Sequence, residues 1–134
     1  MNDRPNDIKR IRPDIGKTIS FDQMGPEEKF QNNTLRPILK LQNSLLLVFF
    51  QNYIIKHKRV YYDLSLEKRL TYIENALYKD HKFRNALKGL IIGHFTVEEY
   101  NEYLQHYSSL NKRMIYMVTE RFKNQVEYFE PIDQ

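Results

Sequence analysis

The residue types that most often carry chemistry are present but do not form a recognisable catalytic or metal-binding pattern. The four histidines are scattered, and none belongs to a His-Glu-x-x-His or Glu-x-x-His motif. Glu102 and His106 are four residues apart, which suits a shared metal ion but equally suits an ordinary exposed pair on one helix face. The chain has no cysteine, which excludes thiolate zinc sites and cysteine nucleophiles. The sequence therefore predicts no metal, no cofactor and no catalytic residue.

Phosphate-binding loops and nucleophile elbows are absent from the sequence as well. The segment Lys88–Gly93 contains two glycines, but it lies inside a helical pattern. An enzyme whose site cannot be recognised from sequence remains an alternative. Such an enzyme would gather ionisable groups in one pocket, for instance Glu102, His106 and Arg113.

Two groups of basic residues are candidates for binding an anion or a nucleic acid. The first is a run at the expected end of a helix, followed by two tyrosines that could stack on bases. The second lies on one face of a later helix. Cations at a helix C-terminus are also stabilised by the helix dipole, which gives the first group an ordinary structural explanation. The candidate residues are Lys56, His57, Lys58, Arg59, His81, Arg84 and Lys88.

Length and composition indicate one soluble domain. The 134 residues are 41% hydrophobic and 28% charged, which is enough apolar material to fold. The longest uncharged run, residues 41–55, is too short for a transmembrane helix, and the N-terminus lacks the apolar core of a secretory signal. A cytoplasmic protein that does not enter the membrane is expected.

The formal net charge of +4 is unevenly distributed. Residues 34–95 carry eleven lysines and arginines against four acidic residues, whereas residues 96–134 carry four against seven. The two segments therefore have charges of +7 and −3, and residues 1–33 are neutral. This asymmetry could steer an anionic partner or another copy of the chain, or it could be ordinary solvated surface.

Residues 1–25 are predicted to form an irregular or disordered arm, because prolines and glycines punctuate them and no period persists. An alternative is an ordered arm that docks its isoleucines on the same chain or on a second one.

Residues 26–130 are predicted to form a single helical domain. Pro26 suits the first position of a helix, and Pro37 predicts either a kink or a break into two helices near residues 33–37. The main helix is expected from about Leu35 to Lys58. Its polar residues occupy one narrow face, so we expect it to be buried nearly all round.

Three further helix starts have recognisable caps. Ser65 precedes an apolar stripe at helical spacing, and Asp80 can cap a third helix that ends at Gly93. Thr96 and Glu99 form a capping box at the start of a fourth helix. That helix keeps its apolar period to Phe129, with a bend expected near Ser108 and Asn111.

These elements predict an all-α, elongated bundle of about four helices, with one long C-terminal helix. The distal half of that helix would overhang its neighbours and need an apolar partner. Two-fold dimers are the commonest oligomers, so we expect a homodimer or another protein partner, with nucleic acid as the alternative. The predicted interface residues are Met114, Met117, Val118 and Phe122.

Four strings carry a resemblance to a known family: residues 34–43, 83–89, 93–100 and 110–114. They resemble a family of small uncharacterised bacterial helical proteins, some of which carry the label "glyoxalase". The resemblance implies a helical fold over about residues 30–125 and supplies no catalytic residue. Glyoxalases of the vicinal-oxygen-chelate type resemble βαβββ modules with metal ligands on strands, which this sequence does not predict. The function most strongly indicated is therefore a helical interaction module that acts as a homodimer.

Overall fold

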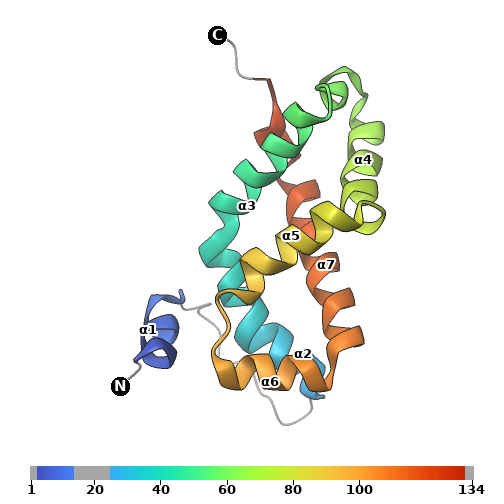
Figure 1. Ribbon diagram of the computed structural model, residues 1–134. Coiled ribbons are helices and arrows are strands. Elements are labelled where there is room, and N and C mark those ends of the chain that lie inside the picture. The colour runs from blue at the N-terminus through green and yellow to red at the C-terminus, as the bar shows by residue number, and fades with distance from the viewer. Residues whose placement is uncertain (1–2, 14–24, 132–134) are drawn as a thin grey trace.

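The computed structural model describes residues 3–13 and 25–131 (Figure 1), and these residues contain helices and no strand. The all-α prediction is confirmed. The helices are α1 (Arg4–Ile11), α2 (Pro26–Phe30), α3 (Arg36–Lys56), α4 (Leu66–Tyr78), α5 (His81–Ile92), α6 (Val97–Gln105) and α7 (Tyr107–Asn124). A π-helical segment, Gln31–Leu35, joins α2 to α3, and 3-10 turns follow α3 (Val60–Asp63) and α7 (Val126–Phe129).

The longest helix is continuous from Pro26 to Lys56, so the prediction of one long C-terminal helix is wrong. Pro37 neither breaks it nor separates two helices. The proline ring clashes with the carbonyl four residues back in a regular α-helix. Here the preceding turn widens, and the Arg36 N–H donates to the Gln31 carbonyl, five residues back. A π-turn of this kind accommodates the proline without ending the helix.

The predicted C-terminal helix is instead broken at His106, where φ is −129° and ψ is 34°. The break comes two residues before the predicted bend at Ser108. It allows α6 to keep Tyr103 buried while α7 turns to pack along α4 (Figure 1). The Tyr103 hydroxyl donates to the Asn111 side chain across the break, which ties the two helices together.

All three predicted N-caps are confirmed. The Ser65 hydroxyl accepts from the Lys68 N–H, and Asp80 accepts from the Phe83 N–H. Thr96 and Glu99 form both hydrogen bonds of a capping box. Each cap is a hydrogen bond between a side chain and a backbone N–H three residues along the chain. Because the contact is local, the cap positions could be predicted from the sequence.

The helices do not lie side by side as an elongated bundle. Helix α5 packs at an angle on α4 and spans the space between α3 and α7 (Figure 1). Phe50 of α3 lies at the centre of the core, and its ring contacts aromatic rings from α5, α7 and both 3-10 turns. The core therefore lies on one side of α3, and side chains on its other side, such as Leu45 and Val48, are about half exposed.

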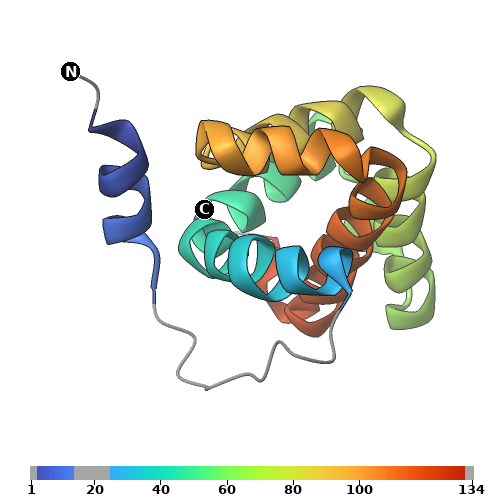
Figure 2. The ribbon, with the colours of Figure 1, turned by 90° about the horizontal axis from the view of Figure 1, so that it is seen from below.

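The described part of the N-terminal arm is a helix, so the prediction of an irregular arm is wrong there. Helix α1 lies beside the end of the molecule where α5 leads into α6 (Figure 2). Its Ile8 is buried, and the Arg4 side chain donates to the Gly93 carbonyl over 3.1 Å. Of the other large apolar residues of the arm, Ile11 is 51% exposed, and Ile15, Ile19 and Phe21 lie outside the described residues.

Arg12 holds the end of the arm. Its guanidinium pairs with both carboxylate oxygens of Glu99, at 2.7 and 2.5 Å, and also donates to the His94 carbonyl. The Thr34 hydroxyl donates to the same carboxylate over 2.9 Å. The Arg12 and Glu99 side chains are only 9% and 13% exposed. One glutamate therefore caps α6 and anchors both the arm and the π-segment.

Two residues just after α3 are in the left-handed region, Lys58 (φ 64°) and Arg59 (φ 59°). Side chains other than glycine adopt this conformation at a cost of about 1 kcal/mol. Lys58→Gly is therefore expected to raise the free energy of unfolding by about 0.5 kcal/mol, after the extra entropy of glycine in the unfolded chain is subtracted. Urea unfolding of Lys58→Gly beside Lys68→Gly checks this. Lys68 lies inside α4, where glycine should destabilise, and equal effects at both positions would contradict the prediction.

By length and composition alone, the Pro26–Lys56 helix is apolar enough to cross a membrane. Core helices of soluble proteins meet the same criterion. One third of its most apolar window is buried inside the protein, and apolar side chains outside that third are partly exposed, such as Leu45 at 48% and Val48 at 50%.

Candidate functional site

The predicted dimer residues lie inside the protein's own core. Met114, Val118 and Phe122 are buried against neighbouring helices, and Met117 packs partly against the same core. Because α7 turns at His106, α4 covers the face that a straight helix would have left exposed. Met114, Val118 and Phe122 are therefore not accessible to a partner in the folded chain, and Met117 is only partly so.

An exposed apolar face lies on α3 instead, opposite the core. Leu41, Leu45, Val48 and Ile55 are 36%, 48%, 50% and 42% exposed. Asn52, also exposed, falls in line with them. The prediction that this helix is buried nearly all round is therefore wrong, since α4, α5 and α7 cover only one side of it. We call Leu41, Leu45, Val48, Asn52 and Ile55 the α3 face.

The spacing along the α3 face is regular. Its positions follow one another at intervals of four, three, four and three residues, which is the spacing of a coiled-coil seam. The face extends over about 21 Å of helix at 1.5 Å per residue. No charged residue lies between Leu41 and Ile55. Sequence periodicity alone did not reveal the seam, because the buried side of α3 is equally apolar.

The predicted basic residues are distributed over separate surfaces. Lys56 and His57 line a pocket between α3 and α5, whereas Arg84 and Lys88 line a smaller one beside α7, on the opposite face of α5. His81 contacts Arg84, and Lys58 and Arg59 are exposed at the end of α3. The predicted residues therefore do not form one continuous basic patch.

The residues proposed for an enzymatic pocket are not brought together. His106 pairs with Glu27 at 3.1 Å, Arg113 donates to Gln31, and Glu102 is exposed. Among the described residues, no group of three or more histidines, aspartates or glutamates is placed to hold a metal ion.

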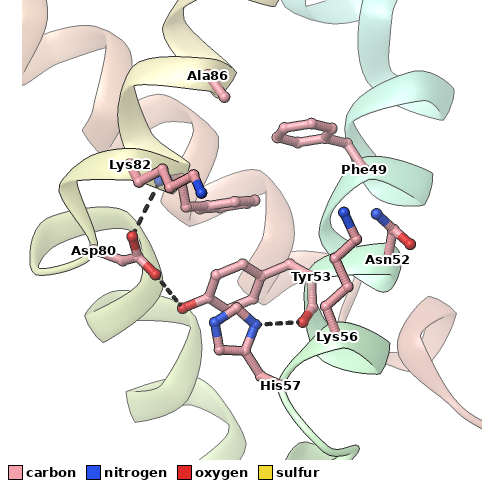
Figure 3. A pocket seen from close by; sticks show the side chains of 9 residues that line it. Phe49, Asn52, Tyr53, Lys56, His57, Asp80, Lys82 and Ala86 are labelled. Carbon is pink, nitrogen blue, oxygen red and sulfur yellow. Dashed lines mark hydrogen bonds between the residues drawn. The ribbon is translucent and has the colours of Figure 1, made fainter.

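The pocket between α3 and α5 has a volume of about 380 Å³ and adjoins the α3 face at Asn52 (Figure 3). Phe49 and Phe83 form its apolar wall, with their rings stacked at 5.3 Å. Lys56 comes from α3 and Lys82 from α5, on opposite sides of the cavity. Lys82 was not predicted, because the pairing of α3 with α5 cannot be derived from local sequence.

Tyr53, His57 and Asp80 form the remaining wall of the pocket (Figure 3). The Tyr53 hydroxyl donates to Asp80 over 2.9 Å, and the His57 ring stacks on the Tyr53 ring at 3.9 Å. The His57 Nδ1 lies 2.8 Å from the Tyr53 carbonyl oxygen. The wall is therefore held by contacts among its own residues.

The electrostatics of this wall favour a neutral tyrosine and a charged aspartate. Burial and the neighbouring Asp80 carboxylate raise the pKa of Tyr53 well above its usual range. The Phe83 N–H lowers the pKa of Asp80, and this effect and the Tyr53 hydroxyl outweigh the opposite effect of burial. Asp80 is thus occupied as an acceptor and forms no ion pair with Lys56 or Lys82 among the described residues.

No protein family, curated protein or solved structure shows a significant match to this chain. What the α3 face and the pocket do must therefore be argued from their own geometry.

Proposed function

We propose that this protein is a helical interaction module that pairs with a second copy of itself through the α3 face. The observation that carries the proposal is the line of exposed apolar side chains at coiled-coil spacing on one helix. Two such faces are complementary to each other, since apolar seams of equal spacing interlock across a two-fold axis. The opposite side of α3 is buried in its own core, so only one partner helix can be accommodated.

Charge and polarity favour a second copy over an unrelated partner. The face carries no charge that would oppose its own copy, and Lys40 and Lys56 lie beyond its two ends. Asn52 lies in the line of apolar residues, where an amide can donate to and accept from the same amide on the other chain. Two Asn52 side chains meet when the helices run parallel, so we expect a parallel pair.

The expected affinity is modest. Full burial of one leucine, isoleucine or valine contributes about 1.5 to 3 kcal/mol, and these side chains are already about half buried. Eight of them across the pair then contribute roughly 6 to 12 kcal/mol, against at least about 4 kcal/mol for association. The dissociation constant is therefore expected to be no tighter than about 1 µM.

Replacing both Leu45 and Val48 by glutamate is expected to leave the protein monomeric, because four carboxylates would then meet at the centre of the seam. Light scattering at about 10 to 200 µM protein measures this. A matched control replaces Val97 and Leu104, which are at least as exposed on α6, by glutamate and should leave association unchanged. A wild type that is monomeric throughout this range, or equal loss in both double variants, would contradict the proposal.

A further inference from the structure

We infer that the pocket between α3 and α5 binds a small aromatic anion, with the ring against Phe49 and Phe83 and the acidic group between Lys56 and Lys82. This inference is independent of the proposed dimer, because it rests on side chains at the edge of the α3 face and on α5. It assigns to the pocket a class of ligand: a flat aromatic or heteroaromatic ring that carries a carboxylate, sulfonate or phosphate.

The apolar wall favours a ring. Phe49 and Phe83 lie nearly parallel, 16° apart, and Phe49 is only partly buried, so it can contact a ligand. Ala86 is exposed at the rim and leaves space beside the two rings (Figure 3). A third ring can extend this stack, because aromatic pairs prefer offset-stacked or edge-on contacts. The cavity of about 380 Å³ lies in the range that encloses a small organic molecule.

The charged groups favour an anion. Lys56 and Lys82 approach from different helices, and neither forms an ion pair within the part of the chain that the structure describes. The one carboxylate in the wall, Asp80, already accepts from the Tyr53 hydroxyl and the Phe83 N–H. Two free ammonium groups against one occupied carboxylate leave the pocket positively charged.

The pocket wall formed by Tyr53, His57 and Asp80 is ordered before any ligand binds. The Tyr53 side chain is held by Asp80 at its hydroxyl, and the His57 ring is held by stacking on Tyr53 and by its contact with the Tyr53 backbone carbonyl oxygen. A wall that is already ordered loses little side-chain entropy when a ligand binds, which favours binding of a small molecule.

Fluorescence titration with anilinonaphthalene sulfonate, an aromatic sulfonate, tests the inference. We expect saturable binding that weakens about three- to fivefold in Lys56→Met and in Lys82→Met, and further in the double variant. Lys68→Met, on exposed α4, is the matched control and should bind as the wild type does. Ala86→Leu should also weaken binding, because it fills the rim without changing charge. Salicylate and adenosine monophosphate, as competitors, distinguish a simple aromatic acid from a nucleotide as the ligand.

The same probe can bind exposed apolar surface, so the variant with glutamate at both Leu45 and Val48 is included. Binding that persists in this variant supports the pocket, even if the proposed dimer fails. Binding lost there but retained in Ala86→Leu and in both lysine variants would overturn the inference. So would an equal loss in Lys68→Met. Near-ultraviolet circular dichroism of each variant checks that its tertiary packing is unchanged, because the probe also binds to loosely packed protein.

Discussion

Glu99→Ala is expected to lower the free energy of unfolding by about 3 kcal/mol and to release the N-terminal helix. The substitution removes the carboxylate that pairs with Arg12, together with one half of the Thr96 capping box. Breaking a buried ion pair by removing one partner costs about 3 to 5 kcal/mol. We expect the lower value, because α1 can move away and return Arg12 to water. Urea unfolding well below about 1 µM protein, where the proposed dimer is dissociated, measures the change.

Release of the arm provides a second readout. Trypsin should cleave after Lys9 and Arg10 faster in Glu99→Ala than in the wild type, because α1 is then no longer held against the domain. Glu98→Ala is the matched control, since this neighbour is exposed in the first turn of the same helix. Its expected loss is below about 0.5 kcal/mol. Similar losses in the two variants would show that Glu99 does not anchor the arm.

The Glu99 carboxylate is expected to make the free energy of unfolding fall at acid pH. Burial by itself raises the pKa of Glu99, but hydrogen bonds from Arg12, Thr96 and Thr34 outweigh it and hold the pKa below its ordinary value. A lowered folded-state pKa contributes stability that is fully present above the unfolded pKa of about 4.3. This contribution is lost as the pH falls through the folded-state pKa. In Glu99→Gln the fall in stability below about pH 5 should accordingly be shallower than in the wild type.

Phe50→Ala is expected to be the most destabilising single substitution in the core, at about 4 kcal/mol. The ring is fully buried, and its centroid lies 5.0 Å from the rings of both Phe122 and Phe129. Its removal leaves a cavity lined by rings from several elements, which cannot all move inward together. The melting temperature should fall by more than 10 °C, since about 1 kcal/mol corresponds to a few degrees in a domain of this size.

Phe49 supplies the matched control for Phe50. It is the adjacent residue and also contacts Phe83, but it is only partly buried at the rim of the pocket. Phe49→Ala should cost about 1 to 2 kcal/mol, because solvent can fill the space. If the two alanine variants were equally stable, the core would not be centred on Phe50.

The features that could be predicted from the sequence were local contacts, between residues close together in the chain. The caps at Ser65, Asp80 and Thr96 were placed correctly, because each depends on a side chain and a backbone group three residues apart. A bend was predicted near Ser108 and Asn111, but the break lies at His106, where no glycine or proline marks it. Tertiary packing determines that break, because α7 buries its apolar side only by turning away from α6.

Contacts between residues far apart in the chain could not be predicted from the sequence. Arg12 and Glu99 are 87 residues apart, and nothing in either neighbourhood indicates the other. Lys56 and His57 were predicted as anion-binding residues, but Lys82 was missed because its role depends on how α5 crosses α3. The dimer was assigned to α7 for the same reason. An apolar run predicts a helix, but it does not indicate which face of that helix the rest of the chain will cover.

The most direct test of self-association through the α3 face is disulfide cross-linking of a single cysteine at position 48. The natural chain has no cysteine, and Val48 is the midpoint of the face, so Val48→Cys meets its own copy in a parallel or an antiparallel pair. A disulfide needs Cα atoms about 4.4 to 6.8 Å apart, which restricts the reaction to side chains in contact. Val97→Cys, more exposed on α6, is the matched control. We predict rapid cross-linking of Val48→Cys and little of Val97→Cys under mild oxidation. Equal or faster cross-linking at position 97 would contradict pairing through α3.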